Sequence, residues 1–332
     1  MVTIIVPKAF TAETVFRFET ELFAMPEDLE YVFDFEHEVI HAEPFGMLLG
    51  GCLFRRFKRE RIRDRTPQPR FLTCNFEKAP YAAHMGFFES FGVPIGNKPG
   101  QAPGSSRYIP ITSLAVPGLQ DQAMEKSVAV GDIIENEAHR LAKLLAQSEA
   151  GDLVDTLSYS FREIFRNVVE HSQADKIWYA AQFWPSKQKV QIAILDEGIG
   201  IRASLSQNTT LSISDDSTAL TLAILPGVSR VRKTDKYDVW GNAGYGLYIT
   251  SKLCVRGGFL ELCSGTKGLS LFEKGYTVSD TFFNGTALKL VFDTSKITSL
   301  QQFCKEIVRE AKNNSTPAKR LSASQVHRIL KQ

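Results

Sequence analysis

Three short motifs constrain this chain more than its composition does. In chain order they are Glu163-Ile-Phe-Arg-Asn167 on a predicted helix, Asp196-Glu-Gly-Ile-Gly200 after an apolar strand, and Gly241-Asn-Ala-Gly-Tyr-Gly-Leu247 before a second helix. Glycines at such junctions allow backbone conformations and close approaches that other residues do not. Each motif is weak evidence alone, so the order of all three carries the prediction.

The first motif places a carboxylate and an amide on one helix face. Glu163 and Asn167 are four residues apart, and His171 continues the same stripe. An Asn carbonyl can bind Mg²⁺ beside phosphates without adding a second anion, because the metal keeps several waters and the phosphates as ligands. A carboxylate one turn away can accept a proton from an attacking water or hydroxyl. An ordinary solvated helix face is the competing interpretation.

The second motif places a carboxylate at the end of the apolar strand Val190–Leu195. Asp196 in this position can accept a hydrogen bond from the amino group of adenine, whereas guanine presents a carbonyl there. Gly198 and Gly200 let the backbone pass close to a base and ribose. A simple turn that leaves a strand is the alternative.

The third motif precedes a helix predicted over 247–255. Glycines before a helix N-terminus expose backbone amides to an anion, and the helix dipole adds to the attraction. The motif is neither a Walker A loop nor a dinucleotide-binding fingerprint, because it lacks Gly-Lys-Ser/Thr and a preceding strand. Thr286, at the start of a later apolar strand, has a hydroxyl that could hold Asp196 or a bridging water.

Together, these motifs resemble the nucleotide site of the GHKL superfamily, which includes gyrase, Hsp90, histidine kinase and MutL ATPases and the anti-sigma-factor serine kinases. The resemblance covers about residues 150–293 and implies ATP and Mg²⁺ as ligands. It implies Glu163 as general base, Asn167 as the metal ligand and Asp196 as the adenine-reading residue. The complete set of expected nucleotide-binding residues is Asn167, His171, Asp196, Gly198, Gly200, Gly241, Gly244, Tyr245, Gly246, Leu247 and Thr286.

The resemblance also implies an ATP lid over residues 202–243. Four basic residues of this segment could reach phosphates, namely Arg230, Arg232, Lys233 and Lys236. A basic loop that is simply solvated is the alternative.

The predicted fold class is α/β, with four segments. They are an α/β domain over 1–112, a helical connector over 113–150, an ATP-binding domain over 151–294, and a C-terminal helix with a basic tail over 295–332. The third segment is expected to be a two-layer α/β sandwich with helices on one face of a mixed sheet, the Bergerat type of the GHKL family. Its predicted elements are a helix at 153–171, strands at 176–184 and 189–195, a helix at 246–256, and strands at 259–264, 269–273 and 285–292.

In the first segment, hydrophobic patterning predicts strands at 31–35 and 70–76 and helices at 45–58 and 82–91. Strands that alternate with helices imply a parallel pair with a right-handed crossover. The segment resembles a STAS domain, the fold of anti-sigma-factor antagonists. In that family a serine at the start of the first helix is phosphorylated, but Glu43-Pro-Phe-Gly46 has no hydroxyl at this place.

Features outside the three motifs argue against two types of GHKL protein, the histidine kinases and the ATPases that carry a transducer domain. His139 lacks the sequence context of a phospho-accepting histidine, and the few dozen residues after 294 cannot form a transducer domain. Two functions remain. One is an ATPase or serine/threonine protein kinase of anti-sigma type, and the other is a non-catalytic switch in which ATP orders residues 202–243.

Bulk properties limit location and partners. The formal net charge of +2 gives no reason to expect nucleic acid, no apolar run approaches a membrane span, and no signal peptide is recognisable. Five scattered cysteines are typical of reduced thiols, which favours a cytoplasmic protein. A protein partner, either a regulator or a phospho-acceptor, is expected, and the resemblance leaves a homodimer open.

Overall fold

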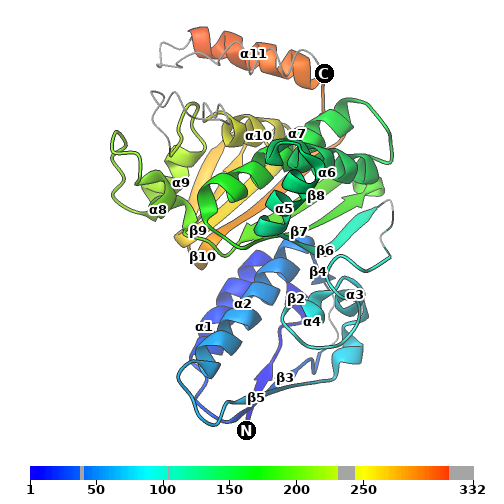
Figure 1. Cartoon of the computed structure of the whole chain (residues 1–332), viewed down its shortest axis with the longest axis vertical. Coiled ribbons are helices and arrows are strands. Elements are labelled where there is room, and N and C mark those ends of the chain that lie inside the picture. The colour runs from blue at the N-terminus through cyan, green and yellow to red at the C-terminus, as the bar shows by residue number, and fades with distance from the viewer. Residues whose placement is uncertain (38–40, 104, 106, 231–243, 314–332) are drawn as a thin grey trace. The chain divides into compact units, whose positions relative to one another are not determined.

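A computed structural model describes residues 1–37, 41–103, 105, 107–230 and 244–313. The chain divides into two compact units. The first contains residues 1–113 with 178–182 and 192–195, and the second contains 114–177, 183–191 and 196–332. Figure 1 labels the helices and strands.

The first unit is built on a parallel sheet in the order β1-β3-β5. Its strands are β1 (Val2–Ile5), β3 (Glu30–Asp34) and β5 (Arg70–Cys74), and the helices α1 (Ala12–Phe23) and α2 (Pro44–Ile62) connect them in turn. β2 (Ala9–Phe10) and β4 (His41–Ala42) form a second parallel pair. The parallel pairing predicted for the strands at 31–35 and 70–76 is confirmed. The sequence-based prediction missed β1 and α1.

Aromatic side chains fill the core of this unit. The Phe54 ring packs against Phe33, with centroids 4.7 Å apart, and against Phe91 at 4.9 Å. The single helix predicted at 82–91 is wrong, because the chain forms η1 (Phe76–Lys78) and the short helices α3 (Pro80–His84) and α4 (Phe87–Ser90). Gly86, at φ +83°, separates α3 from α4, since a left-handed residue cannot continue an α-helix.

The second sheet has five strands in the order β6-β7-β8-β10-β9. They are β6 (Tyr108–Ala115), β7 (Lys176–Trp184), β8 (Lys189–Asp196), β9 (Phe259–Phe272) and β10 (Gly275–Asp293), with the 3-10 turn η3 (Pro185–Lys187) between β7 and β8. β7 matches its predicted range, and β8 extends one residue further. The two strands predicted at 259–264 and 269–273 are one strand, β9, which pairs antiparallel with β10.

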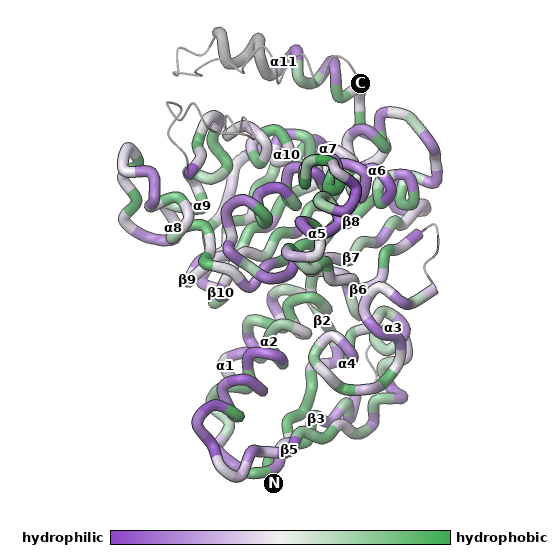
Figure 2. The backbone as a smooth tube through the Cα atoms, viewed as in Figure 1, coloured by the Kyte–Doolittle hydropathy of each residue, from purple (hydrophilic) through white to green (hydrophobic). Residues whose placement is uncertain are grey.

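The helices of the second unit follow the chain from residue 116. They are α5 (Val116–Lys126), α6 (Val130–Ala146), α7 (Asp152–Asn167), the π-helical turn η2 (Val168–Ser172), α8 (Gly200–Leu205), α9 (Asp216–Ala223), α10 (Gly246–Cys254) and α11 (Leu300–Asn313). α6 and α7 pack together, and α10 packs on β9 and β10. Figure 2 shows hydrophobic and hydrophilic residues alternating along α6 and α7, as expected for amphipathic helices that bury one face.

The fold is therefore mixed α/β, with both parallel and antiparallel strand pairing. Helices α6, α7 and α10 lie together on one side of β9 and β10 (Figure 1). Over the described ranges, helices combining the length and apolarity needed to cross a membrane are absent. The basic tail from residue 314 lies outside the described residues.

Candidate functional site

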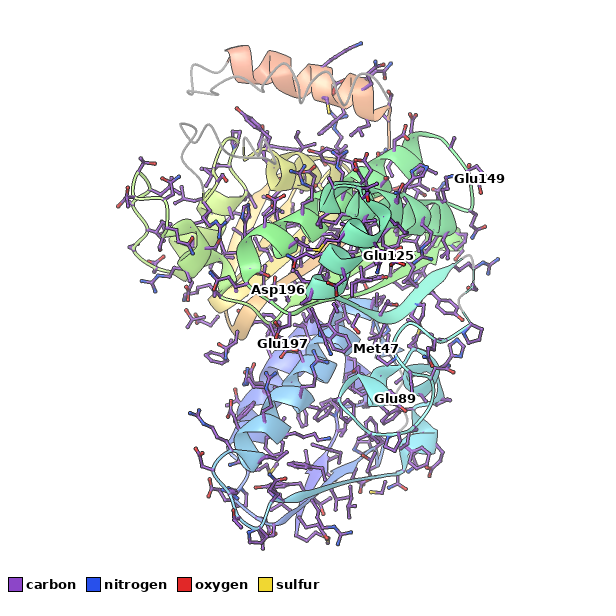
Figure 3. The ribbon with its side chains drawn as sticks, viewed as in Figure 1. Met47, Glu89, Glu125, Glu149, Asp196 and Glu197 are labelled. Atoms are coloured by element: carbon purple, nitrogen blue, oxygen red, sulfur yellow. The ribbon has the colours of Figure 1, made fainter. Side chains whose placement is uncertain are left out.

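Asp196 is the last residue of β8 and is only 2% exposed. Figure 3 shows it with Glu197 at the end of this strand. Burial raises the pKa of the Asp196 carboxyl from 3.8 to about 7, because an apolar environment disfavours the charged form. Three hydrogen bonds oppose this rise, one from the Gly198 amide at 2.9 Å and two from the amide and hydroxyl of Thr286. A strongly perturbed carboxyl of this kind marks a candidate functional site.

The pairing of β8 with β10 places Thr286 beside Asp196. At one end of β8, Gln188 O accepts a hydrogen bond of 2.8 Å from Thr294 N. At the other end, a β-carbon on Gly285 would overlap the Asp196 carbonyl. The two strands therefore run in opposite directions. The φ of +112° at Gly285 accommodates this close approach, so glycine is required there.

The turn after Asp196 packs tightly against the rest of the second unit. Ile199 N donates to Ser172 O at 2.8 Å, and a β-carbon on Gly198 would overlap the same oxygen. Gly200 adopts φ +76° and lies against Ser264 Oγ, which donates to Gly285 O at 2.7 Å. Both glycines are thus required by contacts within the protein.

Helix α7 carries Glu163 and Asn167, both half-buried. It begins after Gly151, and Asp152 and Asp155 in its first turn favour a helix N-terminus through the dipole. The predicted helix at 153–171 is wrong beyond Asn167, because the chain continues as the π-helical turn η2. The different hydrogen-bond spacing takes His171 off the regular α-helical stripe of Glu163 and Asn167. The His171 Nε2 lies 3.9 Å from Glu170 Oε2.

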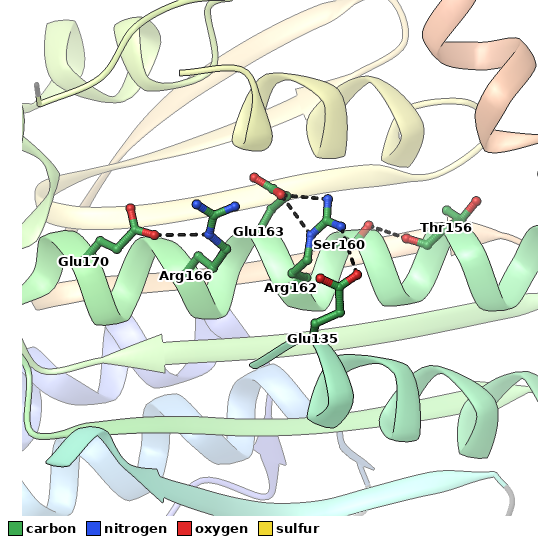
Figure 4. A network of polar contacts seen from close by, with 7 residues as sticks. All are labelled: Glu135, Thr156, Ser160, Arg162, Glu163, Arg166 and Glu170. Atoms are coloured by element: carbon green, nitrogen blue, oxygen red, sulfur yellow. Dashed lines mark hydrogen bonds and ion pairs between the residues drawn. The ribbon is translucent and has the colours of Figure 1, made fainter. Parts of the chain in front are cut away.

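Glu163 points from α7 toward α10 (Figure 4). A β-carbon on Gly246, the first residue of α10, would overlap the Glu163 Oε2 atom. The carboxylate therefore lies at the N-terminus of α10, where exposed backbone amides favour negative charge. The other carboxylate oxygen, Oε1, accepts two hydrogen bonds from Arg162.

The remaining described residues of the third motif form the start of α10. Tyr245 is buried at the N-cap position, and burial raises the pKa of its hydroxyl. Leu247 is half-buried in the first turn. Gly244 adopts φ +71°, and its carbonyl accepts a hydrogen bond of 2.9 Å from Gly227 N.

The expected lid, residues 202–243, contains ordered structure in its described part. The Asp216 Oδ2 of α9 accepts hydrogen bonds of 2.8 Å from both the amide and the hydroxyl of Thr266 in β9. Asn208 Nδ2 donates to Ser229 O at 2.8 Å. Arg230 is described and half-buried. Arg232, Lys233, Lys236 and Gly241 lie outside the described residues.

The structure thus brings six of the predicted residues into two groups. Asp196, Gly198, Gly200 and Thr286 form one group, and Glu163 and Gly246 form the other. The segment α7–η2 links them, because Ser172 contacts the glycine turn. Within the described ranges, no cluster of three or more His, Cys, Asp or Glu side chains could hold a metal ion.

The sequence-based prediction missed four residues that shape these groups. Gly285 precedes Thr286, and its position at the start of the strand predicted at 285–292 was the available signal. Arg162 precedes Glu163, but adjacent helix positions do not normally face one another. Ser172 and Ser264 act through contacts distant in sequence, so nothing local identified them.

Comparison of the sequence with protein-family models and with curated proteins gives no match. The functional assignment therefore rests on the residues and their geometry.

Proposed function

We propose that residues 151–294 bind ATP with Mg²⁺ and that Glu163 serves as the general base for phosphoryl transfer. The observation that carries this proposal is Asp196, an almost fully buried carboxyl at the end of β8. Burial of a carboxylate costs free energy unless hydrogen bonds compensate it. A ligand that donates a hydrogen bond to Asp196 would offset part of the free energy that burial of this carboxylate costs.

Adenine fits the chemistry of this group better than guanine does. The exocyclic amino group of adenine is a donor, and ionised Asp196 is an acceptor only. Thr286 holds the carboxyl through two hydrogen bonds and so limits its orientation. Guanine would present a carbonyl oxygen to the same carboxylate, and two acceptors cannot pair.

Asn167 fits a Mg²⁺ ion bound together with a nucleotide, because its side-chain carbonyl offers one oxygen ligand from the helix that carries Glu163. Mg²⁺ bound with a nucleotide commonly takes one or two protein oxygens and completes its octahedron with phosphates and water. Asn167 lies one helical turn from Glu163 and could supply one such oxygen. When bound, the metal would neutralise phosphate charge.

The N-terminus of α10 suits the phosphates. Gly244 and Gly246 leave its first amides without intervening side chains, and helix N-termini attract anions. Glu163 lies beside this helix start, so a nucleophile there would be within reach of its carboxylate. These roles correspond to those of a GHKL domain in a Bergerat-type fold. They support an intracellular regulatory ATPase or an anti-sigma-type serine/threonine kinase that acts on a protein partner.

Residues 1–112 enter this proposal as a STAS-like regulatory domain. At the start of α2 they present Glu43 and Pro44, which carry no hydroxyl. STAS domains of anti-sigma-factor antagonists are phosphorylated on a serine at the start of this helix, and this chain has no hydroxyl there. The start of α2 is therefore not the phospho-acceptor of the proposed kinase.

Equilibrium binding tests the nucleotide site. Wild-type protein should bind ATP with Mg²⁺ in calorimetry and discriminate against GTP. Asp196→Asn should weaken ATP binding by about a hundredfold, since a site built for a donor loses its charged acceptor. Asp280→Asn, which removes an exposed carboxyl of β10 paired with Lys267, should bind like wild type. Equal ATP binding by wild type and Asp196→Asn would rule out the proposed adenine contact.

Turnover tests the catalytic part separately. ADP release and protein phosphorylation should be measured for wild type and Glu163→Gln in the presence of a host-cell lysate as acceptor pool. Glu163→Gln should keep ATP binding and lose turnover. ATP binding without any turnover in wild type would instead support the non-catalytic switch, in which ATP orders residues 202–243.

A further inference from the structure

Arg162 makes an unusual contact with the residue that follows it. Its Nε and Nη2 donate to the Glu163 Oε1 at 3.1 and 3.0 Å (Figure 4). Neighbouring helix positions point about 100° apart, so the α-helix does not bring such side chains together. Both side chains must bend toward a common point. The contact between Arg162 and Glu163 therefore does not follow from helix geometry by itself.

Other groups hold the Arg162 guanidinium in this position. The Arg162 Nη1 lies 3.5 Å from Glu135 Oε1 of α6. The Arg162 Cζ, the central carbon of the guanidinium, lies 5.0 Å from the centroid of the Tyr159 ring. The Arg162 side chain is only 17% exposed, and that of Glu163 is 12% exposed. A partly buried pair with several supports loses less to solvent screening than a surface ion pair does. The Arg162 guanidinium is consequently held in place, and it can in turn hold the Glu163 carboxylate.

The two oxygens of Glu163 have different surroundings. Oε1 takes both hydrogen bonds from Arg162, whereas Oε2 faces Gly246 at the start of α10. We propose that Arg162 is a positioning residue for Glu163, holding Oε1 so that Oε2 is the atom that receives the proton. This inference rests on the proposed phosphoryl transfer.

The reaction step then assigns each atom. The attacking water or hydroxyl loses its proton to Glu163 Oε2 as its oxygen bonds to the γ-phosphorus of ATP. The bond from the γ-phosphorus to the bridging oxygen breaks, and its electron pair leaves with ADP. Arg162 contacts neither substrate nor proton. Its effect is to restrict the rotation of the Glu163 carboxylate, and orientation of this kind changes the rate of a step more than the binding of substrate.

Substitutions at Arg162 separate positioning from a structural role. Arg162→Met should lower kcat by about tenfold to a hundredfold and leave the KM for ATP within about twofold, because the base remains but is no longer held. Arg162→Lys should lie between wild type and Arg162→Met, since a lysine keeps the charge without the two-pronged donor. All rates should be normalised to ATP-binding sites counted by calorimetry, which removes any contribution from unfolded protein.

Arg166→Met is the matched control. Arg166 lies one turn further along α7 with similar exposure and pairs with Glu170 at 3.1 Å. The Arg166→Met variant should keep kcat within about twofold of wild type, because the ion pair between Arg166 and Glu170 does not hold Glu163. In a Glu163→Gln background, Arg162→Met should cause no further loss of turnover, since the residue it positions is absent.

The outcomes distinguish this inference from the proposed function. If wild type binds no ATP, the proposed function fails and the inference falls with it. If wild type turns ATP over and Arg162→Met keeps the wild-type kcat per site, only the positioning role fails. A matching loss of kcat in Arg166→Met would also overturn it, as would ATP binding without turnover in wild type.

Discussion

Thr286 donates two hydrogen bonds to the Asp196 carboxyl, one from its backbone amide and one from its hydroxyl. The two residues are ninety positions apart in the sequence, and the pairing of β8 with β10 brings them together. Both hydrogen bonds favour the ionised carboxyl, whereas burial disfavours it more strongly and leaves the pKa at about 7. Asp196 is thus poised to change its charge near neutral pH.

Asp196→Asn should stabilise the protein without nucleotide at pH 8. The pKa of Asp196 is raised on folding, so the folded state binds a proton that the unfolded state releases between about pH 4 and 7. The wild-type free energy of unfolding therefore falls as pH rises through this window. A rise of about three units corresponds to on the order of 4 kcal/mol, as an upper limit.

Urea unfolding of both proteins at several pH values from about 4.5 to about 8 measures this effect. This range brackets the raised pKa of Asp196. The gap between Asp196→Asn and wild type should widen as pH rises and level off above about pH 7. Parallel stability curves would show that Asp196 keeps an ordinary pKa. Comparing the two proteins cancels the titration of groups that they share.

ATP affinity should weaken as pH falls through about 7. The proposed adenine contact needs an ionised acceptor, and protonation of Asp196 places a hydroxyl where the adenine donor would bind. Below the pKa, affinity should fall by about tenfold for each pH unit. Calorimetry with ATP and Mg²⁺ from about pH 6 to 9 checks this slope. A flat profile across that range would contradict the role of Asp196.

Thr286→Val should shift that pH profile upward. The Thr286 hydroxyl lowers the pKa of Asp196, so its removal should raise the pKa further, while the backbone hydrogen bond remains. Thr286→Ser keeps a hydroxyl and should retain the wild-type midpoint. A carbon-detected NMR titration of the Asp196 carboxyl measures the pKa without nucleotide. Equal midpoints in Thr286→Val and Thr286→Ser would mean that the hydroxyl does not act on Asp196.

Gly246→Ala should displace Glu163. The added methyl would overlap the Glu163 Oε2, and either the carboxylate or the start of α10 would have to shift. We expect a loss of about 1 kcal/mol or less in stability, because the closest overlapped atom ends a side chain that can rotate away, and a fall in any Glu163-dependent turnover. Thermal unfolding and ADP release measure the two effects.

Gly118→Ala in α5 is the control for Gly246→Ala. A β-carbon there would lie 3.6 Å from the Ala115 Cβ, an ordinary contact. It should leave turnover unchanged and raise stability by up to about 1 kcal/mol, because alanine favours a helix over glycine. Wild-type stability and turnover in Gly246→Ala would show that Glu163 does not lie against α10.

Local patterns were sufficient to predict several elements. Strands β7 and β8 consist mainly of apolar residues, and α6 has apolar residues at helical spacing. Burial of these apolar residues favours a strand in the first two cases and a helix in the third. The glycines before α10 marked a turn for the same local reason. The residue types of the candidate site, Glu163, Asn167, Asp196 and Thr286, were also evident in the sequence.

Local patterns failed where distant contacts decide the backbone. β9 is one strand that includes Gly265 and Gly268, although its register against β10 shifts on both sides of the pair formed by Gly265 and Phe283, as expected for a glycine at a β-bulge. α7 changes to a π-helical turn at Val168, where Ser172 meets the glycine turn after β8. Neither outcome follows from propensity, since each depends on a partner far away in the chain.

The sequence by itself determined which chemical groups this protein has and which elements carry them. Only the tertiary structure decided that Thr286 hydrogen-bonds to Asp196, that Gly246 leaves room for the Glu163 carboxylate, and that Arg162 holds it. The physical reason is that hydrophobic periodicity acts over a few residues, whereas burial and hydrogen bonding depend on which elements pack together. Burial, which packing decides, is the largest cause of the raised pKa of the Asp196 carboxyl.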